Sequence, residues 1–251
     1  MKQGKDKSDT MWDTTKDYRL LLGQKTVNMF VGTARSGSFR GRWNKKMAIE
    51  SAESMGSDFQ TLNYSYLDPK DLANTPEIAK LEEKAELVIR YLGGEDWAHQ
   101  FMNQTPKEDK EKAEEAIAKA RFFIDTILGL KNRILFGSIN DPIIAIDIKV
   151  GEIMSVSKHS KNDSLMICNV NIGKRAIQVV TNDLTVKDGN NVAIAFLPPE
   201  TFSGLVSEGM FLGVGEGILK DVEGELGTMP KGFPLEALNE SRNLIEGYLS
   251  K

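Results

Sequence analysis

The chain has 251 residues, of which 40% are hydrophobic and 27% are charged, and its formal net charge at pH 7 is −4. These values are ordinary for a globular protein of one or two domains. The first ten residues contain no apolar run, and no segment approaches the roughly 18 unbroken apolar residues of a membrane span. We therefore expect a cytoplasmic protein with no secretory signal and no membrane contact.

Cysteine and histidine are too scarce for a disulfide or a metal site. The single cysteine, Cys168, excludes an internal disulfide, and the two histidines lie too far apart along the chain for a familiar zinc motif. We expect no metal and no other cofactor.

The charge is divided unevenly along the chain. Residues 141–251 carry 10 Lys and Arg against 15 Asp and Glu, a net charge of −5, whereas residues 1–140 are close to neutral. Within the first half, the stretch 18–49 contains seven basic residues and no acidic one. Such a block of positive charge is explained either by a binding surface or by a helix or loop face exposed to solvent.

The first 135 residues or so predict an all-helical domain. A helix is expected within residues 11–34, followed by a glycine-containing loop and a helix near 43–55. Apolar residues recur at helical spacing from Pro76 until Gly93-Gly94 ends the pattern. A further helix is expected from Thr105, as its N-cap, and Pro106, in its first turn.

The pattern changes near Asn140. Short alternating runs rich in β-branched residues predict five strands, within 144–160, 164–172, 175–183, 191–199 and 209–215. Turn residues separate them at 171–174 and 187–190. Five strands in so short a segment favour a small closed barrel over a flat sheet with open edges. Residues 234–249 predict a C-terminal helix that packs back on the barrel.

Several spaced motifs in this region then resemble one family. They are Val150-Gly151-Glu152-Ile153, Lys158-His159 with Asp163-Ser164-Leu165, Asn169-Val170-Asn171-Ile172-Gly173, and Ser207-Glu208-Gly209-Met210-Phe211-Leu212. Residues 143 to 214 or so resemble the tRNA-binding OB-fold domain found in methionyl-tRNA synthetases at the C-terminus, in the phenylalanyl-tRNA synthetase β chain and in free-standing synthetase cofactors. The resemblance implies an OB-fold β-barrel that binds tRNA in a groove.

The resemblance also implies which barrel residues contact RNA. Those that match are Lys158, His159, Lys161, Asn182, Ser207 and Glu208. The family places cations where this chain has Pro198, Thr201 and Ser203. Because phosphate contacts supply most non-specific affinity, an acidic barrel lacking these cations is expected to bind tRNA weakly by itself.

The basic N-terminal segment is a second candidate for RNA contact. It interleaves two aromatic residues, Phe39 and Trp43, with five cations, Arg35, Arg40, Arg42, Lys45 and Lys46. Cations suit phosphates and rings suit unpaired bases. The alternative is a solvated basic loop that Trp43 anchors to the helical core.

Other residues favour structural roles. His99 has no partner histidine or cysteine, and Cys168 alternates with Met166 and Val170 as a core residue. The run 106–119 predicts a solvated helix face. No set of residues has convincing spacing for a catalytic triad or carboxylate pair, and an arginine clamp for a phosphorylated substrate rests on the basic loop alone.

The sequence thus predicts a multidomain α plus β protein with a disordered tail (1–10), a helical domain (11–139) and an OB-fold domain with a C-terminal extension (140–251). Its expected function is non-catalytic binding of tRNA or other structured RNA, in trans with an aminoacyl-tRNA synthetase. A homodimer formed through strand edges and the C-terminal helix is also expected. The alternative function is a protein-interaction or dimerisation module that has lost most of its RNA affinity.

Overall fold

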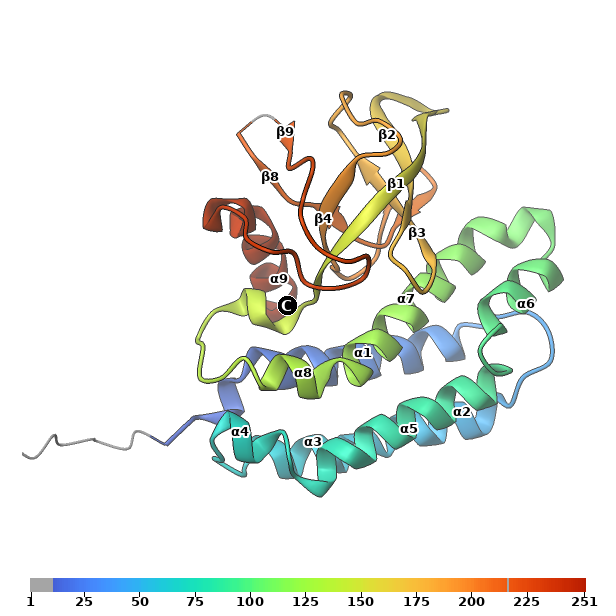
Figure 1. The fold of residues 1–251 in the computed structure, drawn as a ribbon. Helices are drawn as coiled ribbons and strands as arrows, with labels where there is room; N and C mark the ends of the chain where they lie inside the picture. Colours follow the sequence, from blue (N-terminus) through green and yellow to red (C-terminus); the bar gives the residue numbers. More distant parts are fainter. Residues whose placement is uncertain (1–10, 216) are drawn as a thin grey trace, which may run out of the picture.

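The computed structural model describes residues 11–215 and 217–251, so the disordered tail predicted for residues 1–10 lies outside the described residues. A helical domain is followed by a β domain and a C-terminal helix, as Figure 1 shows. This arrangement confirms the predicted fold class. Within the described ranges, no helix is both long enough and apolar enough to cross a membrane.

The helical domain is built from eight α-helices and two short 3-10 turns within residues 11–137. They are η1 (Thr14–Lys16), α1 (Tyr18–Arg35), α2 (Lys45–Glu53), α3 (Met55–Asn63), α4 (Pro69–Leu72), α5 (Pro76–Leu92), α6 (Trp97–Gln104), η2 (Lys107–Asp109), α7 (Lys110–Leu128) and α8 (Leu130–Ile134).

Local sequence signals account for the ends of α5 but not for the start of α7. Pro76 occupies the first turn of α5, and Gly93 ends it with a φ of 126°, a conformation that favours glycine. Thr105 was predicted to cap the start of the next helix, and this prediction is wrong. Its hydroxyl instead donates to the Phe101 carbonyl at the end of α6, 2.7 Å away, and α7 begins only at Lys110.

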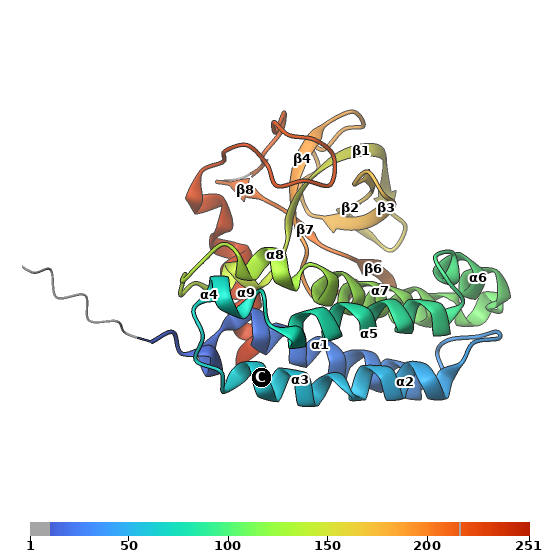
Figure 2. The same ribbon diagram turned by 60° about the horizontal axis from the view of Figure 1, so that its bottom comes forward.

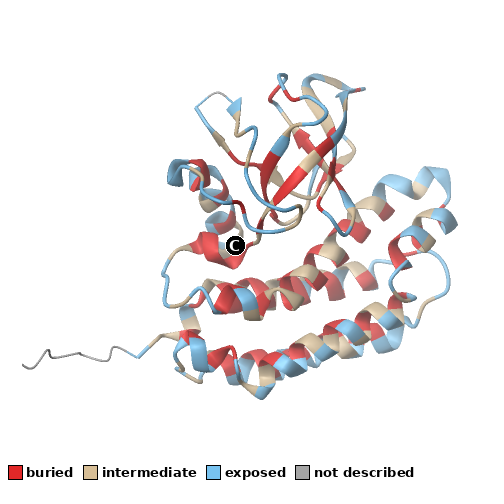
Figure 3. Cartoon of the chain, in the orientation of Figure 1, coloured by how far each residue is buried: buried red, intermediate tan, exposed pale blue. Residues whose placement is uncertain are grey.

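The helices form two layers beneath the β domain. Figures 1 and 2 show α1 and α7 next to the β domain, with α2, α3 and α5 on the far side. Buried positions follow most of α1 and α7, whereas the first turn of α7 is exposed (Figure 3). The N-terminal end of α7 therefore presents its side chains to solvent.

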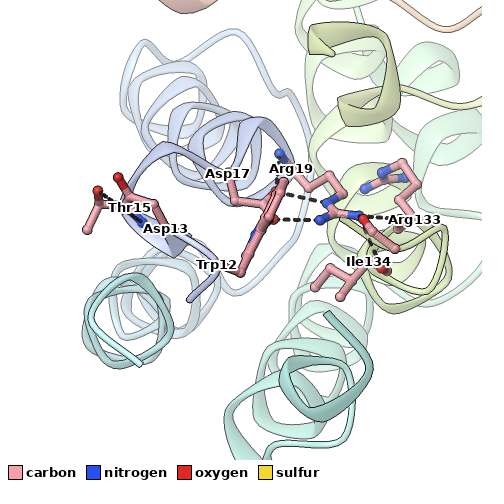
Figure 4. A network of polar contacts seen from close by, with 8 residues as sticks. Trp12, Asp13, Thr15, Asp17, Arg19, Arg133 and Ile134 are labelled. Carbon is pink, nitrogen blue, oxygen red and sulfur yellow. Dashed lines mark hydrogen bonds and ion pairs between the residues drawn. The ribbon is translucent and has the colours of Figure 1, made fainter. Parts of the chain in front are cut away.

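A buried arginine fixes the end of the helical domain. The guanidinium of Arg19, fully buried, donates to both carboxylate oxygens of Asp17 at 2.8 and 2.6 Å. Its Nη1 also donates to the carbonyls of Arg133, Ile134 and Gly137, at 2.9 to 3.1 Å, as Figure 4 shows in part. A cation at a helix C-terminus satisfies carbonyls that have no intrahelical partner. Arg19 thus ties α1 to the end of α8.

The β domain begins after the turn η3 (Pro142–Ala145) and contains one five-stranded sheet and two small hairpins. Its strands are β1 (Ile148–His159), β2 (Asn162–Asn171), β3 (Ala176–Thr181), β4 (Asn191–Ala195), β5 (Glu200–Phe202), β6 (Leu205–Ser207), β7 (Met210–Phe211), β8 (Gly213–Val214) and β9 (Gly217–Ile218).

All pairings in the main sheet are antiparallel, in the order β3-β2-β1-β4-β7. The first half of β1 pairs with β4 and its second half with β2, with an irregularity between Ile153 and Ser155 where the strand changes partner. Gly151 lies at this crossing. A Cβ there would come within 2.7 Å of both Ile194 and Val170, so the interior has room only for glycine.

The two outer strands of the sheet, β3 and β7, face each other around the curled domain. Hydrogen bonds connect β3 to β6 and to Glu208, which follows β6. The Glu208 amide donates to the Gln178 carbonyl (2.9 Å), the Gln178 side chain donates to the Val206 carbonyl (2.7 Å), and the Val180 amide donates to the Ser207 hydroxyl (3.0 Å). These bonds satisfy part of an edge that would otherwise be unpaired.

The two domains share one apolar cluster. It contains Leu22 of α1 and Phe122 of α7 together with Ile148 and Ala195 of the sheet. The C-terminal residues form η4 (Leu235–Leu238) and α9 (Asn239–Ser250), and Ile245 of α9 belongs to the same cluster. The C-terminal helix therefore packs at the junction of both domains, against η3 and α1, as well as on the β domain.

Candidate nucleic-acid interface

The fold brings the basic N-terminal segment and the predicted RNA contact Lys161 to the same end of the molecule. The Nη2 atom of Arg40, in the loop after α1, lies 2.9 Å from Oδ2 of Asp109, which directly precedes α7. The Nζ atom of Lys161, at the tip of the β1–β2 hairpin, lies 3.6 Å from Oε1 of Glu111 in the first turn of α7. Cations more than a hundred residues apart in sequence therefore flank the exposed start of α7.

The cations of the basic loop are exposed and loosely held. Arg35 pairs with Glu53 at 2.6 Å and Lys46 with Glu50 at 3.8 Å, and both cationic side chains are more than half exposed. Among the described residues, Lys45 donates only to the Arg35 carbonyl, at 3.5 Å. Arg42 makes no hydrogen bond or ion pair with any residue in the described ranges. Exposed pairs contribute at most about 1 kcal/mol, so these cations can exchange a carboxylate for a phosphate.

The aromatic residues of the same loop face inward. Phe39 is buried, with its ring centroid 5.4 Å from that of Trp43 and 5.1 Å from that of Phe101. Trp43 is half-buried and also packs on Phe101. The rings thus anchor the loop to the helical core, as the alternative interpretation expected, while the cations remain outside.

His159 is buried and has both ring nitrogens occupied. Its Nδ1 accepts from the Lys161 amide at 3.0 Å, and its Nε2 donates to the Phe202 carbonyl at 3.1 Å. The ring therefore joins the β1–β2 hairpin to the β5–β6 hairpin. In this conformation it presents no free nitrogen to a ligand, whereas the neighbouring Lys158 and Lys161 are exposed.

Ser207 and Glu208 are likewise held by the protein. The Ser207 hydroxyl accepts from the Val180 amide and donates to the Gly209 carbonyl, 2.8 Å away. The Glu208 side chain is 11% exposed, with Oε2 lying 2.7 Å from Arg175 and Oε1 lying 3.7 Å from Arg121 of α7. Neither side chain has an accessible polar group for RNA.

Arg175 and Arg121 were not singled out by sequence reasoning, yet both take part in ionic contacts between the domains. Burial alone would lower the pKa of Arg175, but the carboxylates of Glu208 and Asp125 raise it above its ordinary value. Nothing local in the sequence predicts this contact, because Asp125 and Arg175 are brought together only by the packing of α7 on the β domain.

Asn182, the remaining predicted contact, lies on the wall of a groove of about 560 Å³. Pro198, one of the positions where the resemblance led us to expect a cation, lines the same groove. Gly209 also lines the groove, and it packs closely on the neighbouring strand, since a Cβ there would lie 2.8 Å from the Ala195 carbonyl oxygen. Neither lysine nor arginine is among the described residues that line this groove, so it differs in charge from the cationic end of the molecule.

The described ranges contain no group of three or more histidine, cysteine, aspartate or glutamate side chains placed to hold a metal ion. Cys168 is fully buried, and burial raises the pKa of its thiol to about 11, with a further contribution from the nearby Asp183. The thiol is therefore protonated at neutral pH and lacks the thiolate that nucleophilic chemistry needs.

Comparison with known proteins assigns both domains. Residues 11–137 match a family model described as "Alpha helical domain", and residues 148–236 match one described as "Putative tRNA binding domain". The chain is 29% identical over 100 residues to the phenylalanine–tRNA ligase beta subunit of Thermotoga maritima. That alignment covers 36% of this chain but only 12% of the ligase subunit.

A crystal structure of a MetRS-related protein from Pyrococcus horikoshii is also similar, with 23% identity and a TM-score of 0.30. The match covers 33% of this chain and 87% of that one. The motifs quoted from the sequence lie largely within the second matched region. The chain belongs to the alpha helical domain family through residues 11–137, and it carries a domain of the tRNA-binding type at residues 148–236.

Proposed function

We propose that this protein binds tRNA, or RNA of similar structure, at the cationic end where the basic loop and the β1–β2 hairpin flank the start of α7. The observation that carries the proposal is the convergence of Arg40 and Lys161 on that turn, in a chain that has a domain of the tRNA-binding type. The cations in the proposal are Arg35, Arg40, Arg42, Lys45, Lys46, Lys158 and Lys161.

Binding is proposed to be electrostatic and not catalytic. Exposed cations contact phosphates and position RNA without altering it. Because Phe39 is buried, stacking on unpaired bases has no part in the proposal. The acids Asp109 and Glu111 must release Arg40 and Lys161 before phosphate can replace them.

A salt titration of tRNA binding tests this function. The double variant R40Q/R42Q removes two cations from the loop, and K70Q/K231Q removes two exposed cations from elsewhere as a matched control. Each lost phosphate contact is expected to flatten the slope of log K against log[salt] by about 0.9, so R40Q/R42Q flattens it by nearly 2. Equal affinities and slopes for the two double variants would exclude the basic loop from the interface.

The partner is proposed to be an aminoacyl-tRNA synthetase, to which the chain would deliver tRNA at a raised local concentration. The similarity of this chain to part of the phenylalanine–tRNA ligase beta subunit supports the proposal. A gel-filtration experiment with a synthetase, with and without tRNA, tests it. If no complex forms with methionyl- or phenylalanyl-tRNA synthetase, the protein does not act in trans with these enzymes. The proposal that it binds RNA would be unaffected.

The second candidate function is a protein-interaction or dimerisation module. The net charge of −5 over residues 141–251 favours it, because an acidic surface repels phosphate. Sedimentation velocity over a range of concentrations distinguishes a homodimer from a monomer. A monomer at all concentrations would remove the homodimer from this proposal.

A further inference from the structure

The groove on the β domain lies between strand β3, the β5–β6 hairpin, strand β7 and helix α9. Its volume of about 560 Å³ is within the range of sites that bury a substantial ligand, which runs from about 300 to 1,000 Å³. Its walls come from segments far apart in the sequence, so its shape depends on the whole β domain being folded.

The charge of the groove has one sign. The described residues that line it include three carboxylates, those of Asp183, Glu200 and Glu240, and neither lysine nor arginine. Glu200 and Glu240 are exposed and form no ion pair with any described residue. They carry unneutralised negative charge at the rim.

Asp183 places a further negative charge deeper in the groove. Its side chain accepts from the Ile218 amide at 3.0 Å and from both the amide and the hydroxyl of Thr185 at 2.7 Å. Burial alone would raise the pKa of Asp183, but these hydrogen bonds and the charge of Lys220, which lies outside the groove lining, lower it below its ordinary value. The carboxylate is therefore ionised at neutral pH.

The same groove exposes apolar side chains. Phe202 on the β5–β6 hairpin is 38% exposed and Leu244 on α9 is 44% exposed, and the partly buried Met210 of β7 also lines the groove. Exposed apolar surface framed by polar groups marks a site of interaction with another molecule. The ligand must therefore combine apolar groups with positive charge.

We propose that this groove binds a basic, partly apolar segment of a partner protein, with Lys or Arg side chains meeting Glu200 and Glu240 and apolar side chains meeting Phe202 and Leu244. Charge complementarity selects this occupant. A nucleic acid would bring phosphates toward three carboxylates without any cation in the lining to neutralise them. The inference gives a site and a ligand chemistry to the protein-interaction alternative, and it does not depend on RNA binding at the cationic end.

The test uses a fluorescent ten-residue peptide of alternating Lys and Leu as the probe, with the full-length protein at low salt. Anisotropy is compared for the wild type, for E200Q/E240Q and for E246Q, which removes an exposed charge from α9 outside the groove. The Kd is expected to rise about fivefold or more for E200Q/E240Q and to stay within twofold for E246Q. A peptide with Ser in place of Leu is expected to bind the wild type several-fold more weakly.

A second variant distinguishes a basic peptide from the other possible occupants of the groove, RNA and a second copy of this chain. Leu244→Gln removes an apolar contact from the wall without adding charge, and it is expected to weaken binding of the Lys/Leu peptide while leaving the tRNA titration unchanged. Equal peptide affinity for E200Q/E240Q and E246Q would overturn the proposal. A loss of tRNA binding in Leu244→Gln would also overturn it, because RNA would then occupy the groove. So would the dissociation of a homodimer by Leu244→Gln without any peptide binding, because a second copy would then occupy the groove.

Discussion

Arg175 of the β domain reaches Asp125 of α7, with 3.1 Å between Nη2 and Oδ2, while its Nη1 lies 2.7 Å from Glu208. One guanidinium thus bridges a carboxylate of each domain. The geometry uses the planar fork of arginine, which a lysine ammonium cannot reproduce. The bridge is one of the contacts that hold α7 against the β domain.

Replacing Arg175 with Gln is expected to lower the free energy of unfolding by about 1 to 3 kcal/mol, because Glu208 is left mostly buried with only the more distant Arg121. Urea denaturation of the two proteins measures the difference. R35Q, which breaks the exposed pair with Glu53, is the control and is expected to cost less than about 0.5 kcal/mol. Equal losses in the two variants would mean that the bridge adds nothing beyond a surface pair.

Asp147 is expected to make stability depend on acid pH. Burial would raise the pKa of Asp147, but the Arg133 guanidinium, 2.7 Å away, and Lys149 hold the pKa below its ordinary value. A depressed pKa stabilises the folded state above the unfolded value of about 3.9, and the contribution is lost as the pH falls through the lower folded value.

D147N is therefore expected to be less stable than the wild type at pH 7, by about 1 to 3 kcal/mol, with the difference shrinking below about pH 4. Urea midpoints measured from pH 7 down to pH 3 give the comparison. D163N, at an exposed carboxylate, is the control. A stability difference between D147N and the wild type that stays constant across this pH range would contradict a lowered pKa for Asp147.

Cys168 is expected to react slowly with thiol reagents in the folded protein. With a pKa of about 11, only about one thiol in a thousand is a thiolate at pH 8, and the side chain is fully buried. Alkylation by iodoacetamide is expected to be at least about a hundredfold slower without urea than with it. The chain has a single cysteine, so the rate reports on this residue alone, and similar rates in both conditions would show that the thiol is accessible.

Arg19→Lys is expected to destabilise the protein by about 3 kcal/mol or more. An ammonium group has three donors and cannot serve Asp17 in a bidentate way and three carbonyls at once, so buried acceptors lose their partners. Thermal or urea unfolding measures the loss. R90K, at an exposed position of α5, is the matched control, and a loss as small as in R90K would show that the network tolerates a point charge.

Periodicity and turn residues predicted most of the elements because these signals are local. The helix α5 and the strands of the main sheet begin and end near residues whose backbone preferences are encoded in a few neighbours, such as Pro76, Gly93, Gly173 and Gly189. The hairpin of β5 and β6 was not predicted, since strands of three residues are too short for an alternating pattern. Its turn, Ser203-Gly204, has positive φ at both residues, as two-residue hairpins prefer.

Side-chain roles in the candidate interface were harder to predict because they depend on distant packing. Arg19 is one of the seven basic residues of the stretch 18–49, yet it is buried against α8. His159 is buried by a hairpin some forty residues later, and Glu208 is buried by α7 from the other domain. The exposure of the cations in the basic loop, in contrast, could be predicted from the local sequence, because this segment contains glycine and lacks acidic residues.

Leu22 and Phe122 come from the helical region, yet they lie in the same buried cluster as Ile148 of the sheet and Ile245 of α9. Cutting the chain between residues 137 and 142, where the helical domain ends, would expose these side chains to water on both fragments. The two regions are therefore expected to unfold in one cooperative step. In evolution, neither region can be replaced independently of the other. A different helical region attached to this sheet would need apolar residues that pack into the same cluster.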